Sequence, residues 1–122
     1  MQARNTRQKQ IVDKVMGKAT RPLTVHEILA GGKKFLPSLG LATVYRELNR
    51  LVETGEIQTV TIPGDPPRYE IAKQHHHHFK CTKCDNVYEL EGCLKEITKL
   101  VPKGFKAESH DITLYGLCRA CA

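Results

Sequence analysis

Two pairs of cysteines have the spacing of a zinc knuckle. Cys81 and Cys84 form one CxxC pair, Cys118 and Cys121 form a second, and 33 residues separate them. Two residues between cysteines let both thiolates face one cation, so four sulfurs can complete a closed tetrahedral zinc site. The alternatives are a pair of disulfides, which a reducing cytosol disfavours, and a redox motif, which does not usually occur as a matched pair. We therefore predict a structural Zn²⁺ site.

Four consecutive histidines, His75 to His78, precede the first cysteine pair. Successive side chains of a strand point to opposite faces, so His75 and His77 would share one face and His76 and His78 the other. Each pair can bind a metal if other residues supply further ligands. The alternative is a solvated polar strand that binds metals adventitiously.

The excess positive charge is confined to the first part of the chain. Through Glu53 there are ten Lys or Arg and four acids, which gives +6, whereas the remainder has nine of each, which gives zero. Such a distribution is expected where the basic part meets a polyanion. All five cysteines and five of the six histidines lie in the other part, between His75 and Cys121.

The composition favours a globular protein, because 40% of the 122 residues are hydrophobic and 26% are charged. No apolar run approaches the roughly 18 residues that span a bilayer. The opening stretch, MQARNTRQKQIVDK, has no signal-peptide core. We therefore expect a cytoplasmic protein that makes no use of a membrane. The length allows one ordinary domain or two very small ones, and a very small one usually needs a metal, a disulfide or a partner subunit.

Helical periodicity predicts three helices in the basic part. They are expected at residues 6–17 with Thr6 as N-cap, from Thr24 to the glycines at 31 and 32, and from Leu41 to Gly55. Thr24 and Glu27 have the spacing of a capping box. Strands are expected at 57–62 and 68–71, joined by a Pro/Gly turn. Three helices followed by a hairpin is the order of a winged helix, whose third helix enters the major groove.

Two domains are expected, 1–72 and 73–122, with a short hinge at residues 72–74. The second domain should contain strands at 75–81, 86–90 and 105–116 and a short helix at 94–101. The predicted fold class is α+β, with an N-terminal winged helix followed by a small α/β domain that holds the four-cysteine zinc site.

Taken together, the motifs resemble the ferric uptake regulator family of bacterial metal-dependent repressors. The matching stretches cover nearly the whole chain and are RNTRQKQIV, LATVYRELNRLVETGEI, RYEI, HHHHFKCTKC, NVYEL and HDITLYGLCRAC. The resemblance implies a homodimer in which residues 1–72 bind DNA and residues 73–122 form the dimerisation domain. It also implies that a regulatory metal closes the dimer, so that both recognition helices meet a palindromic operator in double-stranded DNA.

The resemblance implies a regulatory metal site at the hinge. Its ligands match Glu70, His76, His78 and Glu89 of this sequence. Family members often add a histidine just before the second helix, where this chain has Arg21-Pro22-Leu23. The nearby His26 falls inside the helix, and we expect it on the helix surface rather than at the metal.

The resemblance also implies a second metal site on the opposite strand face. Its residues match His75, His77, Glu96 and His110, and the alternative for Glu96 is a solvated acid on a helix surface. Cys93 lies one turn before Glu96 and could compete for the metal. We expect Cys93 instead to be a small buried hydrophobic side chain.

The hinge ligands bear on the choice of metal. Two nitrogens and two oxygens suit tetrahedral zinc, whereas ferrous iron usually takes more ligands. We therefore favour a zinc-responsive repressor, and the alternative is an iron-responsive or peroxide-sensing member that uses Fe²⁺ or Mn²⁺. Peroxide-sensing members tend to carry Asp where Glu70 and Glu89 stand, which weakens that option.

DNA contacts are expected from the first and third helices. Family members touch DNA from the Tyr and Arg of the third-helix motif, here Tyr45 and Arg46, and Thr43 lies beside them. Arg can read guanine and Tyr can pack on a thymine methyl, although core packing is the alternative for Tyr45. Arg4, Arg7 and Lys9 would meet the DNA backbone or minor groove, or else form a solvated helix surface.

No enzymatic activity is expected. A metallo-hydrolase needs a positioned base and a substrate cleft as well as its metal. A zinc-storage or chaperone module would explain the histidines, but it would not explain the basic part or the TVYR helix. Salt-dependent binding to a palindrome would separate a regulator from both alternatives.

Overall fold

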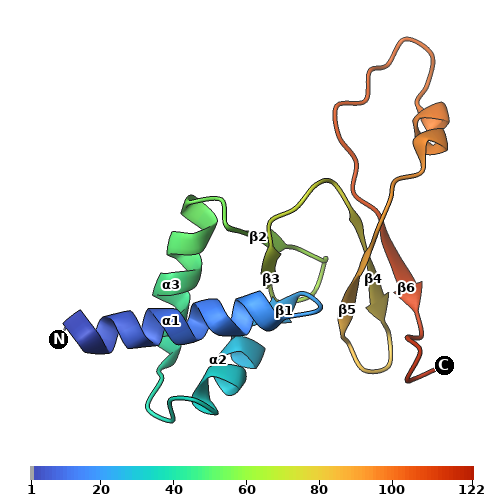
Figure 1. Ribbon diagram of the computed structural model, residues 1–122. Coiled ribbons are helices and arrows are strands. Elements are labelled where there is room, and N and C mark those ends of the chain that lie inside the picture. The colour runs from blue at the N-terminus through green and yellow to red at the C-terminus, as the bar shows by residue number, and fades with distance from the viewer. Residues whose placement is uncertain (1) are drawn as a thin grey trace. The chain divides into compact units, whose positions relative to one another are not determined.

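The computed structural model describes residues 2–122, with side chains from Thr6 onward. The chain forms two compact units, Met1–Ala72 and Lys73–Ala122. Figure 1 shows that the first unit contains the long helices and the second is mostly strand and loop.

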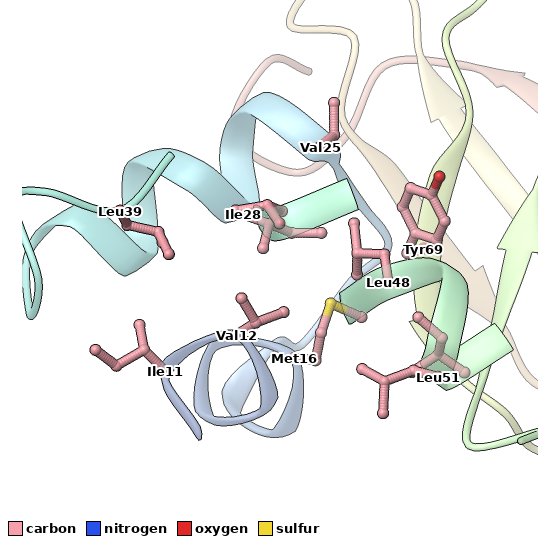
Figure 2. Close-up of a cluster of buried hydrophobic side chains, with 11 residues drawn as sticks. Ile11, Val12, Met16, Val25, Ile28, Leu39, Leu48, Leu51 and Tyr69 are labelled. Carbon is pink, nitrogen blue, oxygen red and sulfur yellow. The ribbon is translucent and has the colours of Figure 1, made fainter. Parts of the chain in front are cut away.

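Three helices form the body of the first unit, and each packs against the other two. They are α1 (Gln2–Lys18), α2 (Val25–Lys33) and α3 (Leu41–Glu53). Figure 2 shows apolar side chains from all three helices meeting in one core, among them Val12, Ile28 and Leu48, which are fully buried. These helices form because their apolar residues recur every three or four positions and so share one side of each helix.

The ends of the helices correct two predictions. α1 begins at Gln2, so Thr6 lies inside the helix and is not its N-cap; the preceding Gln, Ala and Arg are good helix formers and extend it. Gly31 and Gly32 also lie inside a helix rather than ending it. A Cβ atom on Gly32 would approach Leu39 Cδ2 to 2.4 Å, so this glycine allows Leu39 to pack closely against α2.

The capping box at the start of α2 is confirmed. The Glu27 amide donates to Thr24 Oγ1 at 3.2 Å, and the Thr24 amide donates to Glu27 Oε1 at 2.9 Å. These reciprocal bonds satisfy two amides that the first helical turn leaves without carbonyl partners.

A three-stranded antiparallel sheet completes the first unit. Its strands are β1 (Leu23–Thr24), β2 (Ile57–Val60) and β3 (Arg68–Ile71), in the order β1-β3-β2. β2 and β3 form the expected hairpin, although β2 ends two residues earlier than predicted. β1 was not predicted, because two residues are too few to show an alternating pattern.

The second unit is built on another three-stranded sheet. Its strands are β4 (His77–Cys81), β5 (Val87–Leu90) and β6 (Thr113–Gly116), and a 3₁₀ helix, η1, spans Lys95–Leu100. β4 lies in the middle, antiparallel to β5 and parallel to β6. The strand predicted at 105–116 is shorter than expected, because Gly104 adopts a φ of +87° and the polar stretch after it lacks alternation.

No helix in residues 2–122 is both long and apolar enough to cross a membrane.

Candidate metal centres and basic cleft

The two cysteine knuckles lie at the same edge of the second sheet. Cys81 ends β4, and Cys118 follows β6, which runs parallel to β4 with Cys81 paired to Gly116. Because parallel strands end at the same edge, residues far apart in sequence are brought together. The Sγ atoms of Cys81, Cys84, Cys118 and Cys121 all lie within 4.8 Å of one another.

The spacing of these sulfurs fits a tetrahedral zinc ion. Cys84 Sγ and Cys118 Sγ are 3.9 Å apart. A tetrahedron with Zn–S bonds of about 2.3 Å has edges of about 3.8 Å. Cys81, which the chain buries completely, receives two backbone amides on its sulfur, from Cys84 at 3.4 Å and from Cys118 at 3.5 Å.

The electrostatics of the four thiols also call for a cation. The amide hydrogen bonds from Cys84 and then from Cys118 lower the pKa of the Cys81 thiol to about 6. The pKa of the Cys121 thiol is instead raised to about 12, and the largest cause is its side-chain hydrogen bond with Cys118. Four thiolates this close repel one another, so they can all ionise only when a metal ion balances their charge.

A second cluster forms around His77, the first residue of β4, and His75, which lies two residues before it. These histidines meet His110 and Cys93, and the four ligand atoms lie within 4.8 Å of one another. His75 Nε2 is 3.1 Å from His110 Nε2, and Cys93 Sγ is 2.9 Å from the same nitrogen. Burial first, and then the nearby His75 and His110, lower the pKa of His77.

Cys93 corrects an expectation about this cluster. It is exposed rather than a buried hydrophobic side chain, and it stands among the histidines where Glu96 was expected. The predicted helix begins only at Lys95, so Cys93 lies before it and is not one helical turn from Glu96. Glu96 is exposed on η1 and is not part of the cluster.

The residues predicted for the hinge site belong to both units. In the first unit, Glu70 lies on β3 and accepts a hydrogen bond from Gln58 Nε2 at 2.7 Å. In the second unit, the rings of His76 and His78 have centroids 4.8 Å apart, and Glu89 on β5 is directly opposite His78. The carboxylate of Glu89 is paired with Lys73.

One of these histidines has the tautomer that a metal ligand needs. His76 Nδ1 is 2.9 Å from the carbonyl oxygen of Gln74. A carbonyl can only accept, so Nδ1 carries the proton and the lone pair of the neutral ring lies on Nε2. Near the position of the missing fifth ligand, Arg21 is ion-paired with Glu27 at 2.7 Å, and His26 is exposed on α2.

Three of the six predicted DNA-contact residues, Lys9, Thr43 and Arg46, line a cleft between α1 and α3. The cleft has a volume of about 340 Å³ and is lined by Gln8, Lys9, Thr43, Arg46, Glu47 and Arg50. Arg46 donates to Thr43 Oγ1 at 3.2 Å, which orders the guanidinium on the helix surface. Tyr45 is 41% exposed, so it is not part of the core. Arg7 is exposed too, and the Arg4 side chain lies outside the described residues.

The cleft also contains an ion pair that sequence reasoning missed. Glu47 is buried and accepts two hydrogen bonds from Arg50, at 2.8 and 2.7 Å. The spacing of three residues within a helix was the available signal. Because Arg50 is held by Glu47, Lys9 and Arg46 are the lining cations better placed to meet an anion.

Known proteins share this sequence and fold. The sequence model of the ferric uptake regulator family matches residues 1–115. The ferric uptake regulation protein of Campylobacter jejuni is 33% identical over 122 residues, which cover 95% of this chain and 78% of that protein. The ferric uptake regulator of Helicobacter pylori, whose structure is described as revealing three functional metal binding sites, has a TM-score of 0.74 and 29% identity, with coverage of 93% and 79%. FurB of M. tuberculosis, a zinc uptake regulator, has a TM-score of 0.55 and 25% identity, with coverage of 98% and 96%.

A basic helical unit joined to a unit with clustered metal ligands defines a metal-responsive regulator. The chain belongs to the ferric uptake regulator family. Members of this family are transcription regulators rather than enzymes, and they bind DNA as dimers.

Proposed function

We propose that this chain is a homodimeric, metal-dependent repressor that binds a palindromic operator, and that zinc is the metal to which it responds. The observation that carries the proposal is that basic residues and metal ligands are separated between the two units. Lys9, Thr43 and Arg46 line one cleft of the first unit, while the metal-ligand clusters of four cysteines and of His75, His77, Cys93 and His110 lie in the second.

The first unit has the elements of a winged helix. In this interpretation α3 is the recognition helix, the β2–β3 hairpin is the wing, and the positive charge around α1 meets phosphates. Arg46 would read a base and exposed Tyr45 would contact a thymine methyl or a phosphate. Arg7 and Lys9 would supply sequence-independent attraction, and the position of Arg4 in the sequence suits the same role.

The regulatory site is proposed to be Glu70, His76, His78 and Glu89. A bound metal would be ligated by Glu70 from the first unit and by His76, His78 and Glu89 from the second. It would thereby link the wing to the second unit. Coupling energies between two such sites are typically about 1–3 kcal/mol, enough to act as a switch. The tautomer of His76 supports its role as a ligand, and Lys73 competes with the metal for Glu89.

Exposed apolar side chains support dimerisation through the second unit. Leu114, Tyr115 and Leu117 on and after β6 are each at least half exposed. An apolar hollow of about 530 Å³ is lined by Phe79, Tyr88, Leu90, Cys118, Arg119 and Ala120. An exposed apolar surface of this kind is typical of an interface, and a second copy of the chain would bury it.

An iron-responsive repressor is the second candidate. Similarity to two ferric uptake regulators favours it, and so do the two carboxylates proposed for the hinge site, because oxygen ligands suit iron and manganese. Zinc is preferred because the four hinge ligands complete a tetrahedron and because this chain has Arg21-Pro22-Leu23 where members often add a fifth ligand.

Metal-dependent DNA binding tests the proposal. Protein that retains only its structural zinc would be mixed with a fluorescent family-type palindrome, and anisotropy followed while buffered Zn²⁺ or anaerobic Fe²⁺ is added. We expect tightly buffered zinc to switch on binding and iron at cellular concentrations not to. The double variant His76→Ala/His78→Ala should abolish the response, whereas His26→Ala removes a histidine from the surface of α2 and should leave it intact.

The possible outcomes separate the candidates. Activation by iron alone would reject the zinc response and support the second candidate. Zinc binding without any metal-dependent DNA binding would reject a repressor and support a storage or chaperone module.

A further inference from the structure

We propose that Cys93, and not Glu96, completes the second metal site with His75, His77 and His110, which makes it a site of three imidazoles and one thiolate that selects zinc. The inference deepens the zinc response and rests on the proposed function for its regulatory meaning. All four residues belong to the second unit, so the site does not depend on how the two units are arranged.

Short side-chain contacts place Cys93 inside the ligand cluster. Its Sγ is 2.9 Å from His110 Nε2, and that nitrogen is 3.1 Å from His75 Nε2. The His75 and His77 ring centroids are 4.5 Å apart, and those of His77 and His110 are 5.0 Å apart. Three imidazoles and a thiol gathered this closely offer four ligand atoms to one ion.

The backbone explains why a cysteine reaches the cluster from outside the helix. β5 ends at Leu90, and Gly92 has a φ of +89°, a conformation that side chains other than glycine rarely adopt. The chain turns there and places Cys93 before the first residue of η1. Glu96 lies on the exposed helix beyond it.

His77 provides a second, independent sign of a ligand. The residue is 4% exposed, and its Nε2 is buried with no hydrogen-bond partner in the described part of the chain. Its Nδ1 lies 3.1 Å from the Ile112 amide, which can only donate, so in the metal-free neutral ring the proton is on Nε2. To ligate through Nε2, the ring must carry its proton on Nδ1 and give up the bond from Ile112.

The ligand set determines which metal fits. A thiolate is a soft ligand that favours zinc, whereas a carboxylate at the same place would suit iron or manganese. Four protein ligands also close a tetrahedral site, which is the geometry of zinc sites without an open position. With Cys93 in place of Glu96, the second site therefore favours zinc over ferrous or manganous ions.

Cobalt spectroscopy tests the thiolate directly. Co²⁺ would be titrated into the full chain that retains its structural zinc, and the near-ultraviolet band for charge transfer from thiolate to cobalt would be recorded. We expect the band in the wild-type protein and its loss in Cys93→Ser, with zinc affinity at this site reduced more than about tenfold, since even the loss of an outer-shell partner costs about 10–100-fold. Cys93 is exposed, so the serine variant should fold.

Matched variants make the result specific. Cys93→Ser retains all four knuckle cysteines, so any cobalt that exchanges into that site appears equally in the variant and is subtracted. Glu96→Gln should leave both the band and the affinity unchanged. The inference is wrong if the band is the same in wild type and Cys93→Ser, or if Glu96→Gln weakens metal binding as much as the serine variant does.

Two further measurements address the selectivity and the role of His77. The Cys93→Asp variant should bind metal without the charge-transfer band. The ratio of its Zn²⁺ affinity to its Mn²⁺ affinity at this site should be lower than in the wild type by about tenfold or more. In ¹H–¹⁵N NMR spectra, the Ile112 amide signal should shift when zinc fills the site, because that amide loses its acceptor. An unshifted Ile112 signal would remove His77 from the ligand set and overturn the four-ligand site.

These experiments use no DNA, so they test the metal site independently of the proposed repressor function. A cobalt–thiolate band without metal-dependent operator binding would retain the site and reject the repressor. Metal-dependent operator binding without the cobalt–thiolate band would reject the Cys93 site and retain the repressor.

Discussion

The two units of this chain are stabilised by different means. In the first unit, eleven buried residues from three helices, two strands and the loop before α3 form one apolar core. In residues 73–122, all of which are described, only His77, Cys81 and Val87 are buried, and two of these three are candidate metal ligands. A unit of this size buries too little apolar surface to be stable alone. The comparison teaches that the first unit can fold by the hydrophobic effect, whereas the second buries too few apolar side chains to depend on that effect alone.

Removing the structural zinc should have the largest effect and should separate the two units. Structural zinc contributes about 10–16 kcal/mol to the folding of zinc-finger peptides. We expect Cys118→Ser to abolish protection of the β4 and β6 amides against hydrogen exchange while α1 and α3 stay protected. Hydrogen exchange followed by mass spectrometry would measure both at once.

Glu96→Gln is the control for this experiment, because it changes an exposed side chain of the second unit that belongs neither to the four knuckle cysteines nor to the histidine cluster. Retained protection of β4 in Cys118→Ser would contradict the view that metal stabilises the second unit.

A cavity in the apolar core should affect the first unit alone. Leu48 on α3 is completely buried, so Leu48→Ala should lower the free energy of unfolding of the first unit by about 2–5 kcal/mol. Denaturant unfolding followed by helical circular dichroism would measure this loss, and zinc content should not change. Leu41→Ala truncates an exposed leucine of the same helix and should cost much less. Equal losses in the two variants would argue against the core as described.

Charge removal in the cleft should weaken DNA binding without affecting either fold. Arg46→Ala should cost about 1–3 kcal/mol of affinity and relax specificity at one base pair, because it removes a base contact. Lys9→Ala should weaken binding to all sequences and lower the salt dependence by about one counterion. Lys103→Ala, in the second unit, removes the same charge as a control, and it should change neither the affinity for DNA nor its salt dependence. Salt-dependent anisotropy titrations would distinguish these effects, and an unchanged affinity in Arg46→Ala would remove α3 from the interface.

The smallest expected effect concerns an acidic pair in the first unit. Burial, and then a hydrogen bond with Glu47, raise the pKa of Asp13 from 3.8 to about 6, while hydrogen bonds from Arg50 lower the pKa of Glu47. Protonated Asp13 therefore stabilises the fold fully below about pH 4, and this contribution is lost as the pH rises through 6. Asp13→Asn retains a donor to Glu47 at every pH, so it should stabilise the protein more at pH 7 than at pH 5.

The difference in melting temperature between Asp13→Asn and wild type, taken at both pH values, would measure this effect, since metal loss at low pH affects both proteins alike. Glu53→Gln, which neutralises an exposed acid at the end of α3, controls for the change in net charge. A difference that does not depend on pH would show that the proton is not shared between Asp13 and Glu47.

Local signals in the sequence were sufficient for most elements of the fold. The apolar stripe of α3, the capping box of Thr24 and Glu27, and the β2–β3 hairpin depend on residues only a few positions apart, so periodicity and spacing reveal them. The errors arose where a distant contact decided the outcome. Glycine is typical of a helix end, yet Gly32 lies inside α2, where its lack of a side chain lets Leu39 pack closely against the helix.

The metal ligands divide in the same way. The CxxC spacing and the alternation of the four histidines are local geometry, so the pairing of each cysteine knuckle and the grouping of His75 with His77 and of His76 with His78 followed from the order of residues. The predicted strand at 75–81 was nevertheless too long, because β4 begins only at His77. The matched spacing also predicted that all four cysteines share one site, whereas Cys93 was not expected among the histidines; in both cases the tertiary structure makes the contact. The parallel pairing of β4 with β6 brings Cys118 to Cys81, and the turn at Gly92 brings Cys93 to His110. Contacts between segments so far apart in the chain depend on how the backbone folds, and no spacing within the sequence encodes them directly.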